Sequence, residues 1–154
     1  MLTLTRKTEY AMIAVCHLAR EGQKVVSARD IAEAHGVPLP LLMNVLKRLN
    51  RTGYVNSVRG ARGGYILAKA PAEFTLDALI EAVEGPVHLV RCTNPDEEGR
   101  RCTLTGACPV RTSVRKVHDD LRSFLSSVTI AQLAFGEGAA DAECCAQTPK
   151  VMAQ

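Results

Sequence analysis

Three of the six cysteines in this 154-residue chain lie within one short polar stretch, at Cys92, Cys102 and Cys108. Nine residues separate the first two and five separate the second two, without the Cys-x-x-Cys pairs of a zinc ribbon and without a fourth cysteine nearby. One interpretation is a metal or redox site with three local thiolates and one ligand from elsewhere. The other is a disulfide loop.

The cellular compartment bears on this choice. The first fifteen residues, MLTLTRKTEYAMIAV, carry charges and contain no apolar run as long as that of a signal peptide or a membrane span. We therefore expect a cytoplasmic protein that does not enter a membrane. Because a reducing cytosol disfavours structural disulfides, clustered cysteines there favour a metal site or a redox sensor.

Charge is distributed unevenly along the chain. Residues 1–70 hold eleven Lys and Arg against four Asp and Glu, a net of +7, whereas residues 71–154 hold eight against twelve, a net of −4. The basic half is a candidate for binding nucleic acid. Aromatic residues make up only 4% and Trp is absent, which favours packed helices over a β-sandwich or barrel.

Helix start and stop signals in the basic half predict three helices. Thr5 can cap a first helix that continues to Gly22, and Ser27 can cap a second that stops at Gly36. A third helix is predicted over residues 37–53, where the two prolines are confined to the entry and the first turn. Three helices with a tight glycine turn indicate a helix-turn-helix.

A hairpin is predicted directly after the third helix. Residues 54–58 and 65–68 have the composition of short strands, and the glycine-rich tip between them carries Arg59 and Arg62. A plain surface hairpin would also use such glycines, for their positive φ. Two arginines on this tip, just after a basic helix, favour contact with DNA phosphates or the minor groove, so we interpret residues 1–70 as a winged helix-turn-helix.

The third helix has one apolar face, which we assign to the core, and one polar face that could contact DNA. Side chains near its amino end would meet base edges in a major groove, and these are Pro40, Leu41 and Asn44. Basic side chains further along would meet phosphates, and these are Lys47, Arg48 and Arg51. Without the wing, a merely solvated face would be the simpler interpretation.

The second half is predicted to contain two helices. Residues 74–83 form a short amphipathic helix within a connecting segment, 71–91, that leads to the cysteine loop, 92–108. A long helix over 109–133 then carries apolar residues at heptad spacing: Val110, Val114, Val117, Leu121, Phe124 and Val128. This stripe packs on its own domain or pairs with a second copy, and we favour dimerisation. Residues 134–154 are expected to be a disordered tail.

Taken together and in this order, the helix-turn-helix, SVRGARGGY, EAVEG, the cysteine stretch ending ACPVR, and SSVTIAQL resemble one known family. The chain is similar, from residue 2 to about residue 134, to the winged-helix iron–sulfur transcription regulators that include IscR, NsrR and RirA. The resemblance implies a mainly α fold with a small β wing, and a homodimeric bacterial regulator of palindromic double-stranded DNA. It also implies a two-iron or four-iron cluster that senses nitric oxide, redox state or iron supply.

The resemblance further implies a set of cluster ligands. The family's three cysteines match Cys92, Cys102 and Cys108, although the first gap is longer here. IscR-like members have a histidine ligand three residues after the last cysteine, where this chain has Arg111. NsrR-like members use a carboxylate of the partner subunit near the start of the first helix, and the matching residue is Glu9. An ordinary first-turn glutamate, favoured by the helix dipole, is the alternative for that position.

The remaining residues with suitable chemistry are assigned simpler roles. Three histidines are weaker ligand candidates, namely His17, His88 and His118. Cys16 is expected in the core, and Cys144 and Cys145 in the tail are expected to take no part. The chain lacks a nucleophile elbow, a P-loop and an HExxH motif, so we do not expect an enzyme. A cluster-free regulator with a Cys102–Cys108 disulfide switch, or with a protein partner, is the other function considered.

Overall fold

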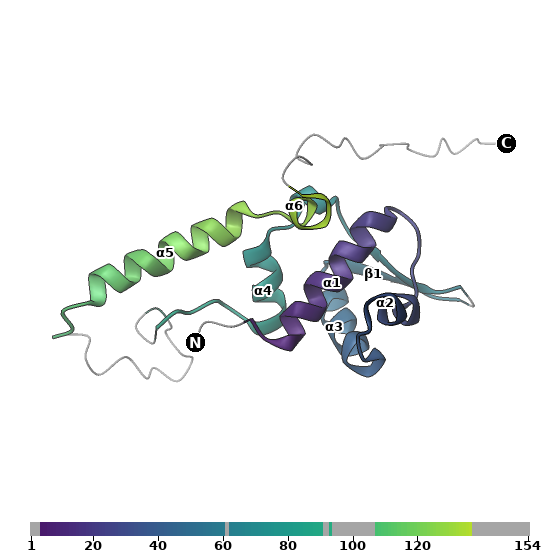
Figure 1. Ribbon diagram of the computed structural model, residues 1–154, viewed down its shortest axis with the longest axis horizontal. Coiled ribbons are helices and arrows are strands. Elements are labelled where there is room, and N and C mark those ends of the chain that lie inside the picture. The colour runs from purple at the N-terminus through teal and green to yellow at the C-terminus, as the bar shows by residue number, and fades with distance from the viewer. Residues whose placement is uncertain (1–3, 61, 91–92, 94–106, 137–154) are drawn as a thin grey trace.

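The computed structural model describes residues 4–60, 62–90, 93 and 107–136 (Figure 1). Cys92 and Cys102 lie outside the described residues, as do Cys144, Cys145 and the tail from residue 137. The described chain is mainly helical with a small antiparallel hairpin, which confirms the predicted fold class.

Three helices open the chain at the predicted places: α1 (Arg6–Glu21), α2 (Ala28–His35) and α3 (Leu39–Arg51). The Thr5 side chain accepts a hydrogen bond from the Thr8 N–H, and the Ser27 side chain accepts one from the Asp30 N–H. These bonds satisfy amide groups that have no partner within a helix start. Gly36 ends α2 in the left-handed conformation, with φ 62°, which only glycine adopts without steric cost.

Strands β1 (Val55–Val58) and β2 (Gly64–Leu67) form the predicted wing, paired antiparallel with Val55 opposite Leu67. A further bridge joins Val26 to Tyr65, so β2 also pairs with the segment between α1 and α2. Gly64 is required at this point, because a Cβ there would lie 2.2 Å from the carbonyl oxygen of Val26. The second strand of the hairpin is therefore bonded to the group of helices α1, α2 and α3, which we call the head.

The core of the head is built from both halves of the chain. The apolar face of α3 is buried as predicted, at Leu42, Val45, Leu46 and Leu49. It packs with Leu18 and Ile31 from the first two helices, and with residues far along the chain, such as Leu79 and Ile130. Residues 1–70 thus form the winged helix-turn-helix, but its hydrophobic core is complete only with residues from the second half of the chain.

The second half begins with a short 3₁₀ helix, η1 (Pro71–Glu73), and α4 (Leu76–Glu84), which Thr75 caps and Gly85 ends. Helix α5 (Arg111–Ser127) extends away from the head in Figure 1, and α6 (Ile130–Phe135) returns to pack on α1. Helix α4 lies between these parts, with contacts to α1, α3 and α5.

The helix predicted over residues 109–133 is divided in two. Helix α5 ends at Ser127, and Val128 is extended because its carbonyl oxygen accepts the Leu76 N–H at 2.8 Å. Thr129 then starts α6 with a capping box, in which Thr129 and Gln132 bond to each other's backbone N–H. The heptad pattern hid this local start signal, and α6 also includes residues 134 and 135, which were assigned to the tail.

Candidate nucleic-acid interface and cysteine site

The polar face of α3 is exposed along its whole length. All six predicted contact residues are exposed: Pro40, Leu41, Asn44, Lys47, Arg48 and Arg51. Leu41 is 49% exposed and Met43 is 38% exposed, although both are large apolar side chains. Met43 was not among the predicted contact residues. Exposed apolar groups beside an amide and basic groups suit a surface that meets both thymine methyls and phosphates.

Arg48 differs from its two basic neighbours on α3. Its Nε donates a hydrogen bond of 2.7 Å to the carbonyl oxygen of Ala82, in the last turn of α4. Carbonyl groups in the last turn of a helix lack partners within the helix and form the negative end of its dipole. The guanidinium of Arg48 therefore joins α3 to α4, a role that the sequence pattern did not suggest.

The wing is attached to the same helix. The side-chain oxygen of Asn50, near the end of α3, accepts the backbone N–H of Ser57 in β1 at 3.2 Å. Arg59 and Arg62 are exposed on the tip, where Gly60 has a φ of 132°. The hairpin thus follows directly from α3 and carries its two arginines beyond the head, as predicted.

Two carboxylates lie at the start of α1, one from α1 itself and one from the end of α4. Glu9 is 40% exposed at its side chain and forms an ion pair with Arg6, at 3.2 Å between Nη1 and Oε2. The second is Glu84 from the end of α4, which accepts hydrogen bonds from the hydroxyls of Thr5 and Thr8. Glu84 was not anticipated, because it is 76 residues from Thr8 in the sequence. Its bonds tie the start of α1 to the point where the chain leaves α4 for the cysteine stretch.

Cys108 is the one member of the cysteine stretch that the structure describes. Its thiol is half-buried three residues before α5 begins, and its carbonyl oxygen accepts the Arg111 N–H at 3.4 Å. The structure therefore tests neither the grouping of the three thiols nor their distance from Glu9. No cluster of three or more potential metal-binding side chains is found within residues 4–60, 62–90, 93 and 107–136.

The other candidate ligands have structural surroundings of their own. His17 Nδ1 and His35 Nε2 share a hydrogen bond of 2.9 Å between α1 and α2. His118 is buried in α5 and stacks on His88, with ring centroids 6.2 Å apart and planes inclined by 13°. Cys16, which was predicted to lie in the core, is partly buried at its edge and packs against it, and burial raises the pKa of its thiol.

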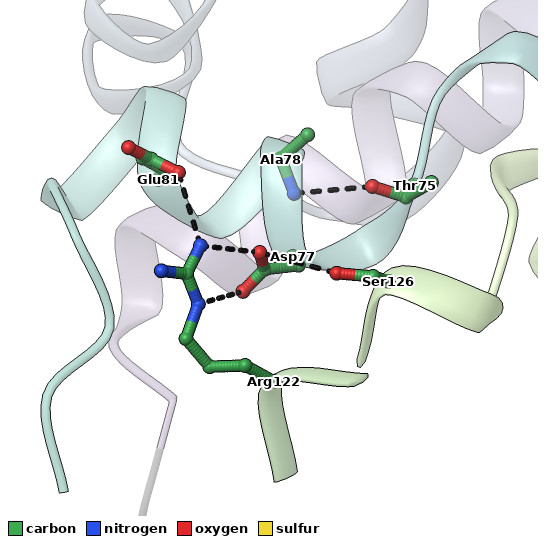
Figure 2. Close-up of polar contacts among 6 residues, drawn as sticks. All are labelled: Thr75, Asp77, Ala78, Glu81, Arg122 and Ser126. Carbon is green, nitrogen blue, oxygen red and sulfur yellow. Dashed lines mark hydrogen bonds and ion pairs between the residues drawn. The ribbon is translucent and has the colours of Figure 1, made fainter. Parts of the chain in front are cut away.

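An ion pair between a partly exposed arginine and a buried carboxylate joins α4 to α5 (Figure 2). Arg122 on α5 donates to both oxygens of Asp77, at 2.6 Å from Nη2 and 3.3 Å from Nε, and its Nη2 also lies 3.4 Å from Glu81. Ser126 donates a further bond to Asp77 at 3.3 Å. The hydrogen bond to Asp77 raises the pKa of Arg122 above its ordinary value. A two-point contact of this kind fixes both the position and the rotation of one helix on the other.

The heptad stripe of α5 is only partly covered by its own chain. Val110 and Val117 are each 55% exposed and Phe124 is 63% exposed, although they recur at seven-residue intervals on one side. Val114 and Leu121 are half-buried. A row of large apolar side chains in contact with water is typical of a surface that meets another protein. Within the described residues, no helix is both long enough and apolar enough to cross a membrane.

Comparison with known proteins identifies a family and several relatives that this chain resembles. The model of the Rrf2 family, described as an iron-dependent transcriptional regulator, matches residues 4–135. The transcriptional regulator IscR of Serratia proteamaculans is 35% identical over 133 residues, which cover 86% of this chain and 79% of IscR. IscR of Yersinia pestis matches over the same shares at 35% identity. These relatives are transcription regulators, in agreement with the expectation that the chain is not an enzyme.

Solved structures support the same assignment. CymR, the global cysteine regulator of B. subtilis, is 26% identical with a TM-score of 0.68, over 87% of this chain and 97% of CymR. IscR of T. potens is 30% identical with a TM-score of 0.61, over 86% of this chain and 85% of IscR. Because the family model covers nearly all of the described residues, this winged-helix chain belongs to the Rrf2 family of transcriptional regulators.

Proposed function

We propose that this Rrf2-family regulator is a homodimeric repressor that binds a palindromic operator, with an affinity controlled by an iron–sulfur cluster. The observation that carries the DNA-binding part is the exposed face of α3 beside the arginine-bearing wing. A single reading helix per chain requires two chains to read a palindrome, and the exposed stripe of α5 supplies a surface for pairing them. Regulation of transcription implies a cytoplasmic location.

Within this proposal the residues of the head have separate tasks. Asn44 and Leu41 meet base edges, because amide groups pair with adenine and apolar groups touch the thymine methyl. Lys47, Arg51 and the two wing arginines neutralise phosphates, which holds the head in register without selecting a sequence. Arg48 is exposed as well, but its Nε is already engaged by α4.

The described donors fit an iron–sulfur cluster. The Cys108 thiol is half-buried three residues before α5 begins, and sulfur of cysteine is the usual protein ligand of such clusters. The Glu9 carboxylate is partly exposed, and Arg6 is an exposed partner that can move away from it. We assign Cys92, Cys102 and Cys108 of one chain, with Glu9 of the other, as the ligands. When bound, the cluster supplies iron and sulfide that react with nitric oxide or oxidants and are lost when iron is scarce.

The first experiment measures whether the cluster exists and matters for DNA. Protein purified without oxygen should be coloured, should contain iron and sulfide in similar amounts, and should change its affinity for DNA when the cluster is removed. Colourless protein without iron would contradict the cluster and favour a thiol switch or a partner protein. The likeness to CymR, a cysteine regulator, shows that this fold also serves other signals.

The second experiment tests whether ligands cross between subunits. Glu9→Ala should shorten the lifetime of the cluster, because the fourth site then opens to water. Glu84→Gln is the matched control, since it changes a carboxylate at the same helix start that already binds two threonine hydroxyls. Mixed dimers of Glu9→Ala and Cys102→Ala chains should recover about one intact site per dimer, because one site receives both defects and the other neither. Full cluster stability in Glu9→Ala would make Glu9 an ordinary first-turn glutamate.

A further inference from the structure

Helix α4 is held by an arginine on each of two sides. From α5, Arg122 grips Asp77 with two nitrogens and reaches Glu81, as Figure 2 shows. From the recognition helix α3, Arg48 bonds the carbonyl oxygen of Ala82. Asp77 lies five residues before Ala82, so the two arginines contact α4 within two helical turns.

The two contacts constrain α4 by different physical means. Asp77 is 6% exposed, and its carboxylate accepts hydrogen bonds from two nitrogens of Arg122 and from the Ser126 hydroxyl. These three bonds fix its position. The carbonyl oxygen of Ala82 lies at the negative end of the α4 dipole, which attracts the guanidinium of Arg48. No N–H group within α4 competes for this oxygen, because carbonyl groups in the last turn lack helical partners. A rotation of α5 would therefore carry α4 with it, and α4 would pull on α3 through Arg48.

The attachment of α5 is reinforced at its other end. The carbonyl oxygen of Val128, directly after α5, accepts the N–H of Leu76, the first residue of α4. Thr75 and Thr129 form a bridge beside it. Helix α5 thus meets α4 at a backbone contact and at a side-chain contact, which together define an angle between the two helices.

We propose that Arg48 and Arg122 are positioning residues that, through α4, set the angle between the recognition helix and α5. This inference rests on the proposed function, because it concerns a dimer in which two copies of α5 pair and two copies of α3 enter successive grooves. In such a dimer the angle determines the distance between the two reading helices. The two arginines would then determine which half-site spacing the protein accepts.

The experiment uses full-length protein purified without oxygen and a series of DNA duplexes. All duplexes carry the palindrome that wild-type protein selects from a random pool, with the centre lengthened or shortened by one or two base pairs. Wild-type protein should bind the selected spacing most tightly. Arg48→Gln and Arg122→Gln should reduce its preference over the altered spacings by about tenfold, which corresponds to about 1.4 kcal/mol.

Matched controls remove the same charge from the same helices without touching α4. Arg51→Gln on α3 and Arg115→Gln on α5 replace exposed arginines. Arg51→Gln should weaken binding by one factor at every spacing, as loss of a phosphate contact does. Arg115→Gln should leave the spacing preference at the wild-type value. Arg48→Lys should restore part of the preference, since an ammonium group also donates to a carbonyl, whereas Arg122→Lys should restore less because it cannot form the fork.

The possible results separate the inference from the proposed function. If Arg48→Gln keeps the full spacing preference and only binds more weakly at every spacing, Arg48 is a phosphate contact and the inference is wrong. Wild-type protein that accepts all spacings equally would also overturn it, because no angle would then be set. If wild-type protein selects no palindrome at all, the proposed function itself fails. Arg48 is exposed and makes one bond to α4, so its glutamine variant is expected to fold even if Arg122→Gln does not.

Discussion

Replacing Asp77 by asparagine should weaken the fold measurably, although both residues have the same shape. The carboxylate is buried, with its side chain 8% exposed, and it accepts two bonds from Arg122 and one from Ser126. An asparagine would keep one acceptor and turn an NH₂ group toward the guanidinium, so two donors would face each other. The change therefore removes the charge and one accepted hydrogen bond without creating a cavity.

The size of the effect follows from how much each partner is exposed. Breaking a fully buried ion pair costs about 3–5 kcal/mol, because it leaves an unpaired charge without water. Arg122 is 36% exposed, so water can solvate its guanidinium once Asp77 is neutral. The cost is then closer to that of a hydrogen bond to a charged group, about 2 kcal/mol. For a folded region of this size it corresponds to a fall in Tm of about 8 °C.

Equilibrium unfolding in urea, followed by circular dichroism at one fixed protein concentration, measures this loss. The control is Glu81→Gln, which alters the exposed and more distant partner of the same arginine and should cost less than about 0.5 kcal/mol. A double-mutant cycle with Arg122→Gln should give a coupling energy of about 1–2 kcal/mol between the two sites. A loss in Asp77→Asn no larger than that in Glu81→Gln would refute the argument from burial.

Three further predictions concern the wing, the thiols and pH. Arg59→Ala should lower the salt dependence of DNA binding, with the slope of log K against log salt falling by about one, as a titration at several salt concentrations would show. Elemental analysis of Cys108→Ala should show a loss of iron and sulfide. Cys16→Ala should retain both, because Cys16 packs against the core and is not an assigned ligand. Burial, and then the charges of His17 and Arg20, lower the pKa of His35 below 6.5. The folded state therefore binds fewer protons than the unfolded chain, so this contribution to stability is present above about pH 6.5 and is lost below it. His35→Gln should flatten that part of the pH dependence of unfolding, and an unchanged profile would contradict the assignment.

Features that depend on neighbouring residues were predictable from the sequence. Thr5 and Ser27 cap helices because their side chains bond the N–H three residues ahead, and Gly36 ends a helix because it adopts positive φ. The buried face of α3 follows from its spacing of apolar residues, and the wing follows from two short strands around a glycine-rich tip. In each case the signal lies within a few residues of the structure that it determines.

Features that depend on distant residues were not predictable in the same way. Arg122 and Asp77 are 45 residues apart, and Arg48 bonds a backbone carbonyl that carries no sequence signature. The break at Val128 was hidden for the opposite reason, because a strong heptad pattern outweighed a correct capping signal at Thr129. The ligand role of Glu9 and the grouping of the three thiols stay predictions, since Cys92 and Cys102 lie outside the described residues.

Because α6 contributes to the core, folding of the head is completed only late in the synthesis of the chain. Ile130 and Ala134 fill the head core beside Leu18, and Arg20 on α1 donates to the carbonyl oxygen of Ala134 at 2.9 Å. A ribosome delivers these residues only after the wing, the cysteine stretch and α5 have been synthesised. Until α6 is made, the apolar side of α1 therefore lacks the part of its cover that α6 supplies. The cysteine stretch is therefore synthesised before the last residues of the core, and the head can close only after that stretch has left the ribosome.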